Sequence, residues 1–89
     1  MSRTLIKGAE AASPTSTGTA STFGSATVVR LVNTDTSAHL VTVVEDQNGT
    51  VVGSFTMPAG SVEFLEKNST YCIFAANAGV KGAAAGYTD

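Results

Sequence analysis

The sequence predicts an all-β protein, a small antiparallel β-sandwich or barrel of about six to seven strands with an extended N-terminal arm. Stretches rich in Val, Thr, Ile and aromatic residues recur at short intervals, and turn signals such as Asn-Gly, Pro-Ala-Gly and Asn-Ala-Gly separate them. No stretch has the spacing of apolar residues that an amphipathic helix needs. These three observations together favour a sandwich or barrel over a mixed fold.

The strongest local signal is a β-hairpin centred on Asn48-Gly49. A two-residue type I′ turn needs positive φ at both positions, which Asn tolerates and Gly adopts freely. Such a turn places Leu40 opposite Met57, and one face of the hairpin is then nearly all apolar. We expect that buried face to comprise Leu40, Thr42, Val44, Val51, Gly53, Phe55 and Met57. Phe55 is therefore expected in the core and Thr56 outside it.

The other strands are predicted from β-branched and aromatic content between turn signals. The three alanines at 83–85 lie between Gly82 and Gly86, which favours strand or coil over helix. Arg30 interrupts an otherwise apolar strand and is expected to reach an edge of the sheet. Besides the hairpin, the expected strands are residues 4–7, 26–33, 61–66, 70–75 and 80–87.

Composition divides the chain into an arm, residues 1–25, and a β-sandwich domain, residues 26–89. From residue 8 to residue 25 the arm is mostly Ala, Ser, Thr and Gly, a composition that buries little apolar surface. A core of about 60 residues is marginal, so contacts with other subunits are a natural source of extra stability. The arm could lie on its own domain or on a neighbouring subunit, and we expect the neighbour. Leu5, Ile6 and Phe23 are the expected assembly contacts, and deleting residues 2 to 22 is expected to leave a folded domain.

The sequence contains no pattern of residues that indicates catalysis, a metal site or a cofactor. His39 is the only histidine, and Cys72, the only cysteine, lies in the most apolar stretch and is expected to pack. Glu45 and Asp46 are adjacent in a predicted strand and therefore point to opposite faces. Tyr71, Phe74 and Tyr87 could stack on a ligand, but aromatic residues in small β domains are usually core. We expect a protein that is not an enzyme.

Charge and hydropathy also bear on partners. Charged residues are 13% of the chain, about half the usual ~25%. The net charge is −2, and the five basic residues are scattered, which gives no sign of a nucleic-acid partner. No run approaches the ~20 apolar residues of a membrane span. Neither a nucleic-acid partner nor a membrane partner is therefore expected.

Several stretches resemble the small β-rich virion structural proteins of tailed phages, especially marine phages that infect cyanobacteria. The stretches are residues 1–7 (Met-Ser-Arg-Thr-Leu-Ile-Lys), 28–34 (Val-Val-Arg-Leu-Val-Asn-Thr), 41–45 (Val-Thr-Val-Val-Glu), 53–60 (Gly-Ser-Phe-Thr-Met-Pro-Ala-Gly) and 66–76 (Glu-Lys-Asn-Ser-Thr-Tyr-Cys-Ile-Phe-Ala-Ala). The resemblance implies a non-catalytic virion component, made in the cytoplasm of a host bacterium.

Three functions follow as expectations from this resemblance and from the composition. The first is capsid decoration or cement, with other virion proteins as partners, the major capsid protein and copies of this chain among them. The second is a neck, tail or fibre-attachment component of the same kind of particle. The third is a free carbohydrate- or peptide-binding β module. The position in the particle distinguishes the first two, and an aromatic groove on a monomer would indicate the third.

Overall fold

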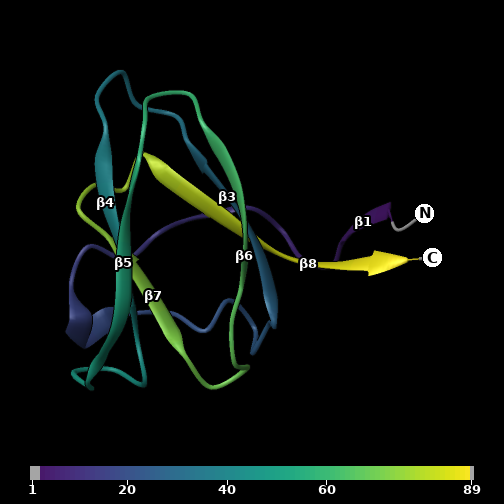
Figure 1. Ribbon diagram of the computed structural model, residues 1–89, viewed down its shortest axis with the longest axis horizontal. Coiled ribbons are helices and arrows are strands. Elements are labelled where there is room, and N and C mark those ends of the chain that lie inside the picture. The colour runs from purple at the N-terminus through teal and green to yellow at the C-terminus, as the bar shows by residue number, and fades with distance from the viewer. Residues whose placement is uncertain (1–2, 89) are drawn as a thin grey trace.

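Two antiparallel β-sheets pack face to face in the computed structural model, which describes the backbone of residues 3–88 and the side chains of residues 6–86 (Figure 1). The first sheet has the strand order β1-β8-β3-β6, with β2 also paired to β8, and the second has the order β5-β4-β7. The elements are β1 (Arg3–Ile6), β2 (Ala11–Ala12), the 3₁₀ turn η1 (Thr17–Thr19), β3 (Val28–Asn33), β4 (His39–Val44), β5 (Val51–Met57), β6 (Val62–Glu66), β7 (Cys72–Ala75) and β8 (Val80–Thr88). The all-β prediction is confirmed, with seven longer strands and the two-residue β2.

The strands form where β-branched and aromatic residues were expected, with ends that differ by one or two residues. The alanine-rich β8 is a strand because β3 pairs with it over residues 80–85, from Asn33 opposite Val80 to Val28 opposite Ala85. Neither β2 nor η1 was predicted. The two alanines of β2 have little intrinsic strand preference, and they are extended because they pair with Gly82 and Lys81 of β8.

The core lies between the two sheets and is built from alternate residues of the central strands. Val29 and Leu31 of β3 face Val41 and Val43 of β4, and Ile73 completes the contact from β7. The other buried members of the cluster are Met57, Ala75 and Val80. Partly buried residues pack around this cluster, namely Phe23, Ala26, Phe55, Leu65 and Tyr71.

The predicted type I′ turn of the β4–β5 hairpin is wrong. The Glu45 N–H donates to the Thr50 carbonyl and the Gly49 N–H donates to the Asp46 carbonyl, each at 2.9 Å, so the loop holds four residues instead of two. Asn48 has the left-handed φ of 60° that was expected, but Gly49 does not. The Asn48 N–H also donates to the Thr17 carbonyl at 3.1 Å, which ties the loop to the arm.

The register of the hairpin differs from the predicted one by one residue. His39 lies opposite Met57 and Val41 lies opposite Phe55, and a bulge between Val43 and Val44 shifts the last pair. Because strand side chains alternate, this one-residue shift exchanges the core-facing and outward-facing residues of β4. Val41 and Val43 therefore face the core, and Leu40 is 46% exposed. On β5 the prediction holds for Phe55, which packs against the core, for Met57, which is buried, and for Thr56, which is exposed. It is wrong for Val51 and Gly53, which are exposed because the bulge ends the regular pairing beside the loop.

The hairpin loop allows a paired test with two glycines of the same hairpin. A Cβ on Gly49 would collide with the Asp46 side chain and lie 2.8 Å from the Asp46 backbone nitrogen. A Cβ on Gly53 would meet nothing within 4 Å. Gly49→Ala should therefore lower the free energy of unfolding by roughly 1–3 kcal/mol. Gly53→Ala, the matched control, should leave it unchanged or raise it by about 0.5–1 kcal/mol. Thermal melts of both variants measure this, and equal melting temperatures would contradict the loop geometry.

Candidate functional site

The N-terminal arm first runs along the free edge of β8. Strand β1 pairs with the end of β8, with Ile6 opposite Ala85, and the Lys7 N–H donates to the Ala84 carbonyl at 2.7 Å. After β2, the Ser13 N–H donates to the Val80 carbonyl at 2.9 Å. The first half of the arm therefore forms the edge of the first sheet.

The second half of the arm crosses to the second sheet and covers the free edge of β7. The Ala75 N–H donates to the Pro14 carbonyl at 2.9 Å, and Ser21 and Ile73 exchange two backbone hydrogen bonds of 3.0 and 2.8 Å. Ala20, which is only 2% exposed, packs against Val44 and Cys72 on the side of this sheet that faces away from the core. The arm thus lies on its own domain over the whole described range.

Three consecutive residues at the end of the arm have left-handed backbone conformations. The φ angles are 52° at Phe23, 72° at Gly24 and 59° at Ser25. Only Gly adopts this region without steric cost, so the surrounding contacts must hold the other two residues there. The Phe23 N–H donates to Ser21 Oγ at 3.0 Å, and the Ser25 N–H donates to Thr22 Oγ1 at 3.1 Å. The sequence offered no signal for this turn beyond Gly24.

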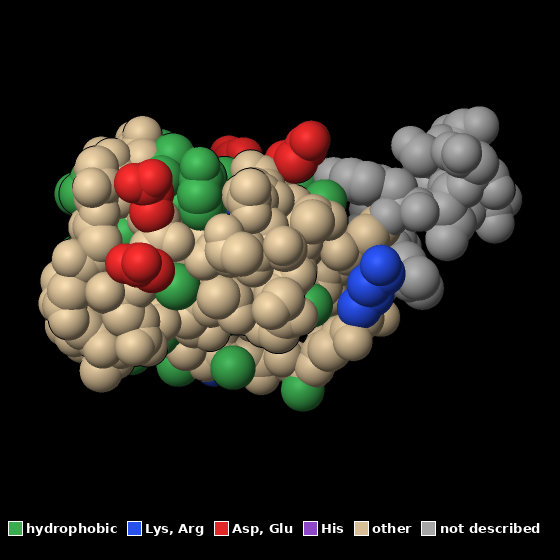
Figure 2. Space-filling view, turned by 90° about the horizontal axis from the view of Figure 1, so that it is seen from below, with side chains coloured by type: hydrophobic (Ala, Val, Ile, Leu, Met, Phe, Trp, Pro, Cys, Tyr) green, Lys and Arg blue, Asp and Glu red, His purple; other side chains and the backbone are tan. Residues whose placement is uncertain are grey.

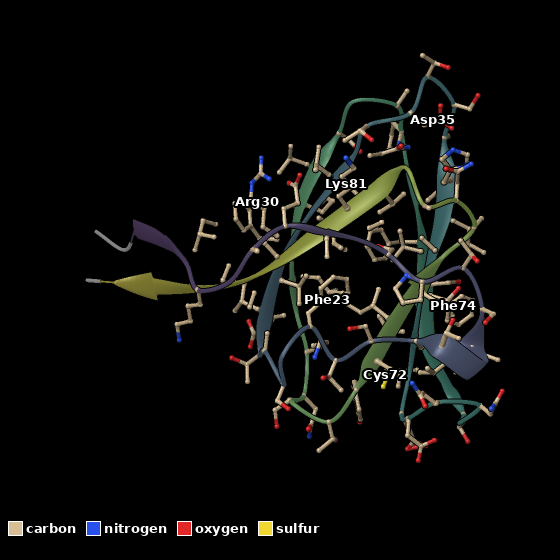
Figure 3. The ribbon with its side chains drawn as sticks, turned by 180° about the vertical axis from the view of Figure 1, so that it is seen from behind. Phe23, Arg30, Asp35, Cys72, Phe74 and Lys81 are labelled. Atoms are coloured by element: carbon tan, nitrogen blue, oxygen red, sulfur yellow. The ribbon has the colours of Figure 1, made fainter. Side chains whose placement is uncertain are left out.

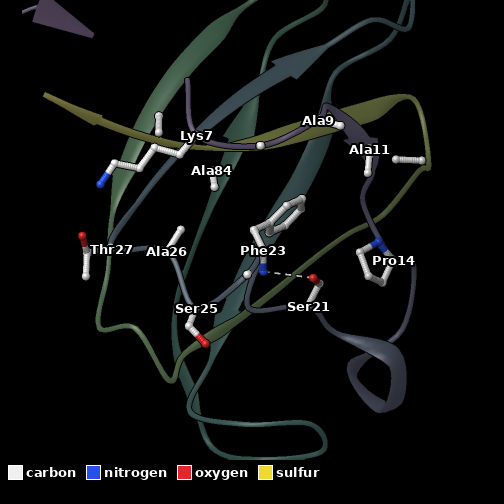
Figure 4. A pocket seen from close by; sticks show the side chains of 14 residues that line it. Lys7, Ala9, Ala11, Pro14, Ser21, Phe23, Ser25, Ala26, Thr27 and Ala84 are labelled. Carbon is white, nitrogen blue, oxygen red and sulfur yellow. Dashed lines mark hydrogen bonds between the residues drawn. The ribbon is translucent and has the colours of Figure 1, made fainter. Parts of the chain in front are cut away.

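The turn places the Phe23 ring against the core. A Cβ on Gly82 would lie 2.8 Å from the ring and 3.0 Å from the Leu31 side chain, so Gly82 provides the space that the ring occupies. A groove of about 580 Å³ lies beside Phe23, between the two passes of the arm (Figure 4). Lys7 is the one charged residue among its lining residues, which also include Pro14 and Thr27. No carboxylate, imidazole or thiol is among the lining residues, so the groove suits binding rather than acid–base or nucleophilic chemistry.

The three residues predicted as assembly contacts do not come together. Ile6 is 51% exposed. It pairs with Ala85, which in turn lies opposite Val28, and Val28 alternates with the core residue Val29. Ile6 therefore lies on the face of the first sheet that points away from the core. Phe23 packs inward against the chain's own core instead of standing free for a neighbour. Leu5 belongs to β1, and its side chain lies outside the described residues.

Sequence reasoning did not single out Val62 and Phe64, two exposed large apolar side chains of the first sheet. Phe64 lies opposite Arg30 and Val62 lies opposite Val32, and both side chains therefore share the face that carries Ile6. Val62 is 43% exposed and Phe64 is 42% exposed. Ile6 lies on β1 and the other two lie on β6, with β8 and β3 between these strands, and we call the three residues together the outer patch. The alternation of β6 placed Val62 and Phe64 on one face, but nothing local showed that Leu65 would be the residue packed inward.

The His39–Asp35 pair lies away from Cys72, the other residue that could carry chemistry. His39 Nε2 lies 2.6 Å from Asp35 Oδ2, and this hydrogen bond lowers the pKa of Asp35 below its ordinary value. Cys72 is buried. In Figure 3, Asp35 lies near the top of the sandwich and Cys72 in its lower part. No group of three or more His, Cys, Asp or Glu side chains in the described part of the chain could hold a metal ion.

Lys67 is a buried cation that the sequence did not single out. Its Nζ donates to the Ala26 carbonyl at 2.7 Å and to the Asn68 carbonyl at 3.4 Å. Burial lowers the pKa of Lys67, because the charged form loses contact with water. The contact ties the start of the β-sandwich domain to the turn after β6, which is a structural role.

Tyr71 packs against the main core and Phe74 packs against the Ala20–Val44–Cys72 cluster, so neither forms an exposed stacking platform. The side chain of Tyr87 lies outside the described residues. On the face seen in Figure 2, charged side chains are few and no basic patch gathers. Within residues 3–88, no helix is long and apolar enough to cross a membrane.

Comparisons with protein-family models, with curated proteins and with solved structures found no match to this chain. The surfaces and edges of the molecule therefore carry the functional proposal.

Proposed function

We propose that this protein is a non-enzymatic structural protein of a phage particle, and that it decorates or cements the capsid. It resides in the virion after synthesis in the cytoplasm of the host bacterium. Its partners are the major capsid protein and copies of itself, bound through the first sheet and the N-terminal arm. The observation that supports this proposal is the outer patch, and the resemblance of the sequence to phage virion proteins supplies the setting.

The outer patch has the character of a protein-binding surface. Three large apolar side chains, each 42% to 51% exposed, share one face of one sheet. The same face also carries Arg30, Lys81 and Glu66, and Arg30 pairs with Glu10 at 3.5 Å. Large apolar and aromatic side chains are enriched in the centres of protein interfaces, and charged residues belong to the rim. The outer patch would bind a flat apolar area on a shell subunit.

The end of the first sheet extends this contact area. Strand β8 pairs with β3 only as far as Ala85, and from Gly86 to Thr88 its partner among the described residues is β1. The two strands therefore project from the sandwich as a ribbon, as Figure 1 shows. Ile6 belongs both to the projecting ribbon and to the outer patch. A ribbon of this kind can add to a neighbouring sheet through its backbone groups.

Replacing Phe64 tests the proposal. Phe64→Glu replaces the aromatic side chain of the outer patch with a charge and should lower incorporation into particles at least about tenfold, the effect of a typical interface hot spot. Leu40→Glu is the matched control, because Leu40 is 46% exposed but lies on the second sheet. Incorporation is measured by quantitative mass spectrometry of purified virions, and circular dichroism checks that both variants fold.

Normal incorporation of folded Phe64→Glu would overturn the proposed role of the outer patch. Imaging of labelled protein on intact virions then separates decoration from the neck, tail or fibre-attachment alternative. Decoration requires a distribution over the whole shell, whereas the alternative requires label at one vertex or along the tail axis.

A free carbohydrate- or peptide-binding module is the second candidate, and the groove beside Phe23 favours it. Its volume of about 580 Å³ lies within the usual range of ligand sites, roughly 300–1,000 Å³. Titration with oligosaccharides and short peptides, followed by amide NMR, should move the signals of Lys7 and Ser25 if this function is correct. Unchanged signals would remove this candidate.

A further inference from the structure

We infer that β5 is a pairing edge for a second copy of this chain, and that two β5 strands join antiparallel about a two-fold axis at Ser54. The second sheets of the two copies then form one continuous six-stranded sheet. This inference uses a different surface from the outer patch and does not rest on the proposed role in a particle.

The sandwich has four sheet edges, and β5 is the one that is both open and uncharged in the described chain. The edge beside β8 is covered by β1 and β2, and the edge beside β7 is covered by Pro14 and Ser21. Strand β6 is open but carries Glu63 and Glu66, the charges that commonly protect an edge from pairing. Strand β5 has no charged residue and no proline over Val51–Met57.

The directions of the peptide groups in β5 follow from the backbone hydrogen bonds and the register of β4. The Ala76 N–H donates to the Leu40 carbonyl, so the even-numbered residues of β4 direct their peptide groups toward β7. The Glu45 N–H donates to the Thr50 carbonyl, which agrees with odd-numbered residues facing β5. Phe55 lies opposite Val41 and therefore bonds to β4. The peptide groups of Ser54 and Thr56 then point outward, where they are free to pair.

The register of the two paired β5 strands is inferred from the residues that would lie opposite each other. With Ser54 opposite Ser54 of the second copy, both residues present outward N–H and C=O groups and exchange two hydrogen bonds. Gly53 then lies opposite Phe55 of the second copy. A Cβ on Gly53 would meet nothing within 4 Å, so this space is open for the neighbouring aromatic ring. A register centred on Phe55 would put the two rings opposite each other and Gly53 opposite Met57 of the second copy.

Pairing also removes apolar surface from water. Val51 is 59% exposed and Val52 is 51% exposed, at the end of β5 that lies beside the hairpin loop. The two-fold axis places Val52 opposite Thr56 of the other copy, and Val51 opposite Met57. Because the bulge lies between Val43 and Val44, the strand is regular from Gly53 onward, where the central pairs form.

Symmetric disulfide formation tests the register. In Ser54→Cys the two Cα atoms would be about 5.5 Å apart, within the range of a disulfide. In Thr56→Cys, the matched control, the two positions would be four residues apart along the strand, about 13 Å, which a disulfide cannot span. Mild oxidation of the native protein should cross-link Ser54→Cys and leave Thr56→Cys monomeric. The native Cys72 is buried and present in both variants.

Sedimentation equilibrium of the full chain tests the dimer itself. The wild type should dimerise, and Ser54→Lys should raise the dissociation constant at least about tenfold, since two charges would meet at the axis. Thr15→Lys, at an exposed position of the arm, should leave the dissociation constant unchanged. The inference is overturned if the wild type is monomeric up to ~1 mM. It is also overturned if folded Ser54→Lys dimerises normally or if Thr56→Cys cross-links as readily as Ser54→Cys.

Discussion

Deleting residues 2 to 22 is expected to unfold the domain, in contrast to the expectation from the sequence. The deletion removes the strands that cover β8 and the backbone partners of Ile73 and Ala75. It also removes Ala20, which leaves Val44 and Cys72 open to water. A core of this size supplies only about 3–5 kcal/mol, and these losses are of the same order. Far-ultraviolet circular dichroism and a thermal melt should show a chain without a cooperative transition.

A shorter deletion is the control for this result. Removing residues 2 to 6 takes away β1, whose pairing is confined to the end of β8, and leaves every contact from Lys7 onward. This variant should keep a cooperative melt within a few degrees of the wild type, because the ends of a chain contribute little to global stability. A folded 2–22 deletion would show that the sandwich core is sufficient without the arm. If the 2–6 deletion also fails to fold, the projecting ribbon is part of the folding unit.

Asn33→Ala should have the second largest effect. Asn33 is fully buried, and its Nδ2 donates to the carbonyls of Ser37 and Met57, each at 2.9 Å. Its Oδ1 accepts from the Asp35 N–H at 3.0 Å. Alanine leaves a cavity and removes the partner of the buried Met57 carbonyl, at a cost of roughly 2–4 kcal/mol. Urea unfolding measures this change.

Asn33→Asp separates the hydrogen bonds from the volume of the side chain. The carboxylate keeps the acceptor for Asp35 but places a negative charge against two carbonyl oxygens. At neutral pH this variant should be less stable than Asn33→Ala, and it should recover as the carboxyl is protonated in mild acid, where it can donate one hydrogen bond. Equal stability of wild type and Asn33→Ala would mean that the three contacts contribute nothing.

The sequence by itself determined the positions and type of the long strands. Val28-Val29 in β3 and Ile73-Phe74 in β7 are β-branched and aromatic residues between turn signals, and their preference for extended backbone is local. The left-handed conformation of Asn48 was also local, because a short polar side chain tolerates positive φ. These features depend on a few neighbouring residues, and no distant contact was needed to predict them.

Only the tertiary structure decided which face each strand presents and where the arm lies. Both faces of β4 are apolar, so its pattern fits two registers, and the four-residue loop with its bulge selects the one that buries Val41. Apart from Phe23 and Ala20, the arm has few side chains that specify a place, and most of its position follows from backbone hydrogen bonds to the open edges of β8 and β7. Backbone groups are the same in every residue apart from proline. The side-chain pattern of the sequence therefore cannot predict which backbone groups pair. The pairing of the arm is decided only when the two sheets, with their open edges, have formed.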